Sequence, residues 1–309
     1  MRQAAGYYNS ATRRSEKITK LLYSRSAEIH VIVDGQTQLE QYSMRREAVW
    51  TLALFILLMI SATAGSVLRT RLPAPHRGSE TIDFLRVVTA LLVTFAALVM
   101  SLLLASELNA YTAASHDRNH YAAGLAEMDL CLRNYGSALD NERQLLHSYT
   151  AAVIASTWPG EPNPPEVAYP DISKLPLIGE APALGTILNT IGLGIARQQP
   201  ADPFHQALMT RCHQVFNNLM TGRWTVIEDA HGSLSAPFLG VLIFWLMLVF
   251  LSFGLQAPKN LLAGAIVAVA IVSVASVMFV ILDLDLPYGG LFGISSTSMR
   301  HALADMLAQ

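Results

Sequence analysis

The sequence has few charged residues and only two cysteines. Asp, Glu, Lys and Arg make up 14% of the 309 residues, whereas a soluble domain has about 25%. The formal net charge of -2 leaves no basic excess to neutralise phosphates, which argues against a nucleic-acid partner. Intrinsic disorder is excluded because 52% of the residues are hydrophobic. Cys131 and Cys212 are too few for a disulfide framework or a zinc ribbon.

Charged residues are absent from four long apolar runs, at 49–68, 87–106, 233–258 and 260–282. Each run is long enough to cross a hydrocarbon core of about 30 Å as a helix that rises about 1.5 Å per residue. A soluble enzyme of this length could not cover four such runs with polar surface. The sequence therefore predicts an all-α integral membrane protein, in contact with the lipid bilayer, with four transmembrane helices.

The spacing of the runs predicts two helical hairpins that flank a helical extramembrane domain. Residues 48–106 form the first transmembrane hairpin, and residues 233–283 form the second, in which Pro258 ends one helix. Residues 107–232 are long enough for a domain on one face of the membrane. Residues 284–309 are a tail with a short helix. Residues 1–47 are a polar extension, of which we expect 1–43 to be poorly ordered and to precede a natural start at Met44.

Within the domain, apolar residues from Leu125 to Val153 recur at alternating steps of three and four. This pattern predicts a helix packed on its neighbours, with an intermolecular coiled coil as the alternative. Gly136 is expected to break or kink the helix.

The second half of the domain begins with a proline-rich stretch, 158–182, which predicts an extended loop. The uncharged run 181–196 is too short and too rich in glycine for a fifth span, and an interfacial helix is the alternative. A last amphipathic helix is expected to start at Asp202 or Pro203 and to lead back to the membrane.

Polar residues within the spans are the candidates for a pore. Proton pumps and coupled transporters keep an ionisable residue at mid-membrane, and the four runs contain none. Hydroxyl groups could line a pore without a fixed charge. The pore-lining candidates are Ser61, Thr89, Thr94 and Ser101. The three on the second span do not form one convincing stripe at helical spacing, which favours a protein that does not conduct.

Small residues at helical spacing predict where the spans approach closely, either within one subunit or between subunits. The predicted helix-packing residues are Ser61 and Gly65 on the first span and Gly264, Ala268 and Ala275 on the fourth.

Two acidic residues follow the fourth span, where hydrocarbon gives way to headgroups. Asp283 and Asp285 are followed by Pro287, Gly289 and Gly290, which predict a turn at the membrane interface. The leading interpretation is an interfacial anchor held by salt bridges. The expected basic partners are Arg45, Arg46 and Arg223. The alternative is a divalent-cation site, since carboxylate oxygens suit calcium, although two carboxylates rarely suffice.

The sequence contains no catalytic triad and no phosphate-binding loop. His116 and His120 are spaced for one helix face but lack a third ligand, so we expect a solvated face and no metal. Cys212 is interpreted as a helix-core thiol. Ser295, Ser296 and Ser298 are interpreted as the cap of a last helix. We therefore expect no enzyme, no catalytic residue and no cofactor.

Several segments resemble a family of bacterial membrane proteins of unknown function labelled bestrophin-like. In the first half these are LRTRLPAPH (68–76), LVTFAALVMSLLLAS (92–106) and LRNYG (132–136). In the second half these are GRWTVIED (222–229), APFLGVLIFWLMLVFLSFGLQAPKN (236–260) and VILDLDLPYGGLFGISSTSMRHAL (280–303). The similarity covers roughly residues 49–303 and is weakest across the proline-rich loop.

The resemblance implies an oligomeric anion channel with four spans in each subunit, as in bestrophins. Two features depart from that pattern. Phe95 is the sole aromatic residue of the second span, and Asp283 with Asp285 would be a reduced version of the bestrophin calcium clasp. The leading hypothesis is therefore a homo-oligomeric bestrophin-like ion channel or pore. The competing one is a non-conducting scaffold or sensor whose central domain binds an unknown partner protein.

An even number of spans places both termini and the central domain on one side of the membrane. The basic residues that flank the spans are nearly balanced between the two sides. Those of segment 1–43, which include Arg13, Arg14 and Lys17, favour a cytoplasmic domain in a bacterial inner membrane.

Overall fold

The computed structural model describes residues 49–73, 78–171, 180–200, 202–232, 234–258 and 260–308. These residues form helices joined by turns and loops, and none of them lies in a strand. In chain order the helices are the first helix (Val49–Arg71), α2 (Ser79–Tyr135), the short 3-10 helix η2 (Ser137–Leu139), α3 (Asp140–Thr157), α4 (Pro182–Ala196), α5 (Pro203–Asp229), α6 (Ala236–Gln256), α7 (Leu261–Leu284) and α8 (Thr297–Ala308). The predicted all-α class is confirmed. The predicted extension 1–47, with Met44, lies outside the described residues.

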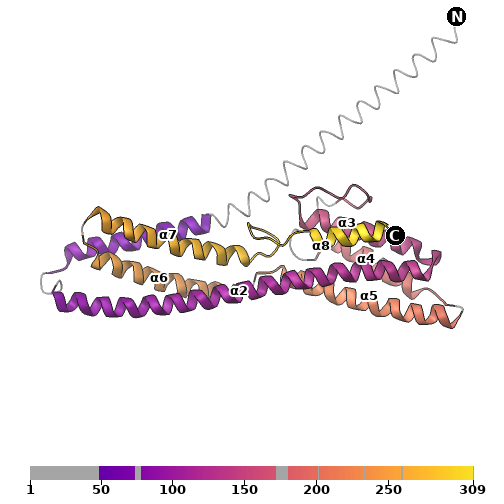
Figure 1. Ribbon diagram of the computed structural model, residues 1–309, viewed down its shortest axis with the longest axis horizontal. Helices are drawn as coiled ribbons and strands as arrows, with labels where there is room; N and C mark the ends of the chain where they lie inside the picture. Colours follow the sequence, from indigo (N-terminus) through magenta and orange to yellow (C-terminus); the bar gives the residue numbers. More distant parts are fainter. Residues whose placement is uncertain are drawn as a thin grey trace, which may run out of the picture.

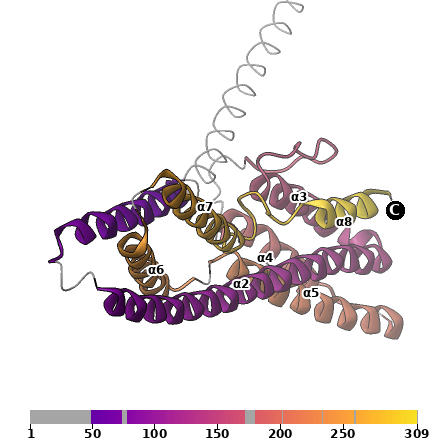
Figure 2. The same cartoon turned by 60° about the vertical axis from the view of Figure 1, so that its left-hand side comes forward.

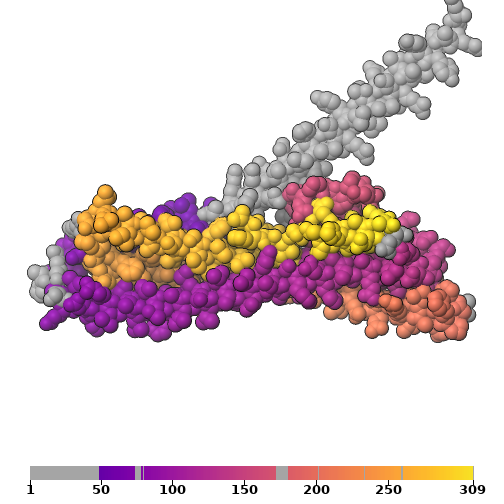
Figure 3. Space-filling view, viewed as in Figure 1, coloured from indigo at the N-terminus to yellow at the C-terminus, as the bar shows by residue number. Residues whose placement is uncertain are grey.

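The molecule is elongated, and α2 runs along nearly its whole length (Figure 1). The first helix, α6 and α7 gather around one half of α2, whereas α3, α4, α5 and α8 gather around the other half (Figures 1 and 2). The chain from α7 through the following turn to α8 lies along one face of both halves (Figure 3). We call the first half the membrane bundle and the second half the domain.

The membrane bundle contains the four helices that are long and apolar enough to cross a bilayer, which are the first helix, α2, α6 and α7. The predicted spans are confirmed. Their shared core includes the fully buried side chains of Leu58, Phe250 and Ile271. Only 22% to 28% of the most apolar window of each helix is buried within the chain. The remaining apolar surface must therefore face lipid or another subunit.

Helix α2 joins the two halves, because it has 57 residues and continues through residue 106 without a break. At a rise of about 1.5 Å per residue it is about 85 Å long, far more than a bilayer core requires. It ends at Tyr135, where Gly136 has φ 101, a conformation that favours glycine. The predicted break at Gly136 is confirmed.

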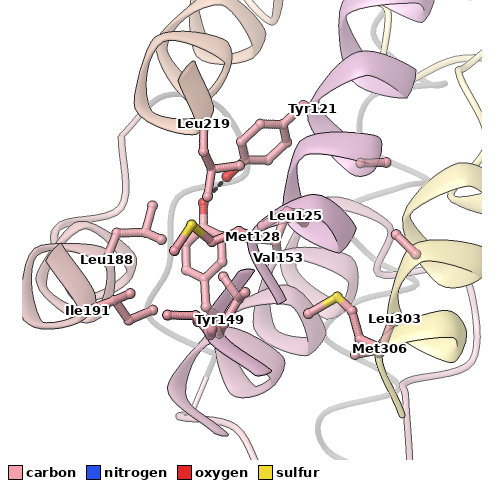
Figure 4. Close-up of a cluster of buried hydrophobic side chains, with 14 of the residues drawn as sticks. Tyr121, Leu125, Met128, Tyr149, Val153, Leu188, Ile191, Leu219, Leu303 and Met306 are labelled. Carbon is pink, nitrogen blue, oxygen red and sulfur yellow. Dashed lines mark hydrogen bonds between the residues drawn. The ribbon is translucent and has the colours of Figure 1, made fainter. Parts of the chain in front are cut away.

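The domain core is built from the apolar pattern expected between Leu125 and Val153. Leu125, Met128 and Tyr149 are buried against residues of α4, α5 and α8 (Figure 4). The pattern thus packs inside one chain, as the first of the two interpretations expects. Asp202 begins α5 as its N-cap and accepts hydrogen bonds from the amides of Phe204 and His205, which confirms the predicted start.

The run 181–196 forms α4 and lies in the domain. Its apolar face is buried against α3 and α5, so the run packs in the domain core, which disfavours the alternative of an interfacial helix. The face consists of Leu184, Leu188, Ile191 and Ile195. A helix with an apolar stripe on one side can pack that stripe against a protein core or against a membrane surface. The sequence alone does not distinguish these two environments.

Cys131 of α2 and Cys212 of α5 form a disulfide, with Cα atoms 5.6 Å apart. Both residues are buried in the domain core. Cys212 lies in the helix core as interpreted, but it is not a thiol, because α2 and α5 pack against each other and bring together residues that are 81 apart in sequence.

Candidate functional site

Two of the four pore-lining candidates lie inside the membrane bundle. The Ser61 hydroxyl is buried and donates to the Met247 carbonyl oxygen of α6 at 2.6 Å. The Thr89 hydroxyl is also buried and accepts a hydrogen bond of 2.9 Å from the Gln256 side chain. These hydroxyls connect neighbouring spans of one chain and cannot face a pore between subunits.

The other two candidates, Thr94 and Ser101, lie on α2 and are exposed. They are seven residues apart, so they share one face of the helix. With Thr89 turned inward, the outward-facing hydroxyls do form a stripe. Thr112, also exposed and five helical turns beyond Thr94, extends this stripe toward the domain.

Small residues allow the first helix and α6 to meet, as predicted for Ser61 and Gly65. A Cβ atom on Gly65 would overlap the Leu251 carbonyl of α6, and one on Gly254 would overlap the Ala62 carbonyl. The two backbones are therefore in direct contact. Gly254 is absent from the predicted set, because the sequence does not show that α6 faces the first helix.

The predicted small-residue stripe of α7 packs only at its C-terminal end. Ala275 is buried and Ala268 is half-buried. Gly264 is exposed, and a Cβ atom there would meet no other atom within 4 Å. Gly264 therefore has no packing partner among the described residues.

The acids after the fourth span bind backbone amides. Asp283 is buried and accepts hydrogen bonds from the amides of Leu291 at 2.8 Å and Phe292 at 2.9 Å, one on each carboxylate oxygen. Asp285 accepts a hydrogen bond of 3.0 Å from the Leu234 amide, just before α6. Asp283 thus holds the turn after α7 together, and Asp285 ties this turn to the segment that precedes α6.

Pro287, Gly289 and Gly290 lie in turns and bends between α7 and α8. Gly290 has φ 70, and a Cβ atom there would overlap the Asp283 carboxylate. The expected salt bridge to Arg223 is wrong, because the carboxylate paired with this arginine is Glu180. Arg45 and Arg46 lie outside the described residues.

The described residues contain no group of three or more His, Cys, Asp or Glu side chains that could hold a metal. The alternative of a divalent-cation site at Asp283 and Asp285 therefore gains no third ligand. His116 and His120 are exposed on α2, as expected.

A cavity of about 80 Å³ lies in the domain, between α2, α3, α4, α5 and the turn after α7. Arg118 of α2 and Arg223 of α5 line it and are only 3% and 5% exposed. The side chains of Tyr121, Tyr149 and Tyr288 line it as well. Its wall includes the end of α5, which precedes α6, so the cavity lies near the junction with the membrane bundle.

Arg118 is held by aromatic side chains. Its guanidinium carbon lies 4.4 Å from the ring centroid of Tyr288 and 5.0 Å from that of Trp158. Its Nε donates to the Tyr288 hydroxyl at 3.3 Å. Within the described segments, no carboxylate forms an ion pair with Arg118, although Asp229 is close enough to interact with it through its charge.

The other polar groups that line the cavity include neutral hydroxyls, and one half-exposed acid lies beside Arg223. The hydroxyls of Tyr121 and Tyr149 are 2.5 Å apart and point toward each other (Figure 4). Burial raises the pKa of Tyr149, so its hydroxyl stays neutral at physiological pH. Arg223 lies 3.6 Å from Glu180, whose side chain is 45% exposed. The cavity therefore offers positive charge and hydrogen-bond donors.

A family model, the bestrophin-like domain, matches residues 56–299. The chain belongs to the bestrophin-like family. The match begins in the first helix and ends in α8, so it includes both hairpins, the domain and both arginines of the cavity. The resemblance expected from the sequence is confirmed.

A solved structure of a bacterial bestrophin homologue from Klebsiella pneumoniae, determined as a point mutant, is similar to this bestrophin-like protein. The two share 14% sequence identity, and the match covers 84% of this chain and 97% of the other, with a TM-score of 0.45. No curated protein sequence matches the chain.

Sequence reasoning missed the arginine cavity of this bestrophin-like protein. Arg118 and Arg223 are 105 positions apart, and neither belongs to a recognisable ligand motif. One signal was present, since each arginine stands on a helix that adjoins an apolar run, with an aromatic residue, Tyr121 or Trp224, close by in sequence. That signal shows that an arginine is near a membrane, and only the packing of α2 on α5 shows that the two share a cavity.

Proposed function

We propose that this bestrophin-like protein is a subunit of a homo-oligomeric ion channel or pore. The observation that carries the proposal is the outward-facing hydroxyl stripe of Thr94 and Ser101 on α2, on a span that leaves most of its apolar surface uncovered. Subunits arranged around an axis would bring these stripes together. A ring of hydroxyls can replace part of the hydration shell of an ion without adding a fixed charge.

The family supports the same function, because bestrophins are oligomeric channels. No ionisable side chain is needed in such a pore, in agreement with the charge-free apolar runs. The competing function is a non-conducting scaffold or sensor, which needs no polar stripe on α2.

We expect the purified protein to be an oligomer in detergent and to carry current in planar bilayers under chloride and sodium gradients. Thr94→Cys and Ser101→Cys should introduce sites at which a charged thiol reagent reduces that current. The native cysteines do not interfere, because they are joined in the disulfide.

Thr63→Cys is the matched control, because Thr63 is an exposed hydroxyl residue on the first helix, away from the stripe. The reagent should leave the current of this variant unchanged. A monomer without current would contradict the channel and favour the scaffold. Equal block of all three cysteine variants would contradict a pore lined by α2.

We propose that the domain and both termini lie outside the cytoplasm, with the spans in a bacterial inner membrane. Disulfides persist in oxidising compartments and are rare in the cytosol, and this protein buries one in its domain. Arg69 and Arg71 lie at the end of the first helix, and Arg86 lies near the start of α2. These helix ends are at the end of the bundle away from the domain (Figure 1), and positive charge there favours the cytoplasmic side. This proposal reverses the orientation expected from segment 1–43, which lies outside the described residues.

The state of Cys131 and Cys212 in the cell tests this orientation. A bulky maleimide should modify the denatured protein only after reduction, and it should modify the protein without reduction when the cells lack their extracytoplasmic thiol oxidase. Free thiols in normal cells would contradict the orientation.

A further inference from the structure

We infer that the cavity between Arg118 and Arg223 is a binding site for a small inorganic oxyanion of the size of phosphate, sulfate or bicarbonate. The site is in the domain and is separate from the proposed pore. Binding at this site does not depend on whether the protein conducts ions.

The charge inside the cavity is the first argument. Removing a guanidinium group from water costs free energy unless an opposite charge accompanies it. Arg118 and Arg223 are both almost completely buried and line the same cavity. An anion between them would compensate two buried cations at once.

The acids of the protein compensate these cations only in part. Glu180 is half-exposed and lies 3.6 Å from Arg223, which makes a long and partly screened ion pair. Asp229 lies near Arg118 but forms no ion pair of 4 Å or less with it. One oxygen of Asp229 is buried without a hydrogen-bond partner in the described part of the chain. Burial and the charge of Asp117 raise the pKa of Asp229, so its charged form is itself destabilised.

The size and the donors of the cavity define the ligand class. One water molecule needs about 10–15 Å³, and the cavity has about 80 Å³ by the same measure. Several waters or one small anion therefore fit inside it. Guanidinium groups bind oxyanions through parallel N–H donors, and both arginines line this cavity.

The full-length protein in detergent provides the test. Sodium phosphate, sulfate and bicarbonate are titrated against sodium chloride at constant ionic strength, with thermal unfolding and tryptophan fluorescence as readouts. Trp158 and Trp224 lie against the two arginines, with centroid distances of 5.0 and 5.3 Å, so binding should change their emission. We expect a saturable change and a higher Tm with at least one oxyanion. Responses identical to that of chloride for all three would overturn the proposal.

Substitutions place the site. Arg118→Gln and Arg223→Gln should each weaken the affinity about tenfold or more, because each removes charged hydrogen-bond donors. Asp229→Asn should strengthen the affinity, because it removes a competing negative charge. Arg211→Gln is the control, since Arg211 lies on the exposed surface of α5 and pairs with Glu127. An Arg211→Gln variant that loses binding, or an Asp229→Asn variant that binds more weakly than the wild type, would contradict the site.

Discussion

Reduction of the Cys131–Cys212 disulfide is expected to lower the free energy of unfolding by about 4 kcal/mol. The disulfide joins residues 81 apart. In the chain-entropy model, a cross-link that closes a loop of this length lowers the conformational entropy of the unfolded chain, which stabilises the folded state by about that free energy. It also ties α5 to α2, the helix shared by the domain and the membrane bundle. The domain should therefore unfold at a lower temperature in the presence of a reductant, as followed by circular dichroism.

A Cys131→Ala/Cys212→Ala double variant is the matched control for this experiment. It should unfold at a lower temperature than the oxidised wild type, and reductant should have no further effect on it. Wild-type protein that is shown by thiol labelling to be fully reduced, yet unfolds at the same temperature as the oxidised form, would contradict the expected role of the disulfide.

Gly254→Ala is expected to destabilise the membrane bundle by about 1–3 kcal/mol, the range found for overpacking in a close-packed interior. The added methyl group would overlap the Ala62 carbonyl, and the backbone of the first helix cannot move aside without disturbing the contact at Gly65. Gly254→Leu should prevent the two helices from packing. Thermal unfolding and the yield of folded protein in detergent measure both effects.

Gly240→Ala is the control, because Gly240 lies on the same helix and an added Cβ atom there meets no atom within 4 Å. Alanine is the better helix former by about 1 kcal/mol, so this variant should be as stable as the wild type or more stable. Equal destabilisation at Gly240 and Gly254 would show that the close approach of the two helices is not what requires glycine.

The features that could be predicted from the sequence are those in which one local pattern has one physical solution. Four long charge-free runs require a membrane environment, since no aqueous surface can accommodate them. Gly136 and Asp202 mark a helix end and a helix start through their own backbone preferences and hydrogen bonds. The bestrophin-like resemblance rests on such local segments and is confirmed by the family match.

The candidate site could be predicted only in part. The residue type makes the four hydroxyl residues candidates, but it does not show that Ser61 and Thr89 face inward while Thr94 and Ser101 face outward. The partners of Asp283 and Asp285 are backbone amides of residues that come later or much earlier in the chain. A carboxylate accepts hydrogen bonds from a backbone amide as readily as from a guanidinium group. Which donor it binds depends on which segment of the chain approaches it in the fold.

The sequence by itself determined the helical class, the four long apolar helices and the family, because hydrophobic length and local backbone chemistry act over short distances. Only the tertiary structure decided that Cys131 meets Cys212, that Gly254 meets the first helix, and that Arg118 and Arg223 share a cavity. Each of these pairs is far apart in the chain. Their contact depends on which faces α2, α5, α6 and the first helix present to one another, and that choice depends on the packing of the whole bundle.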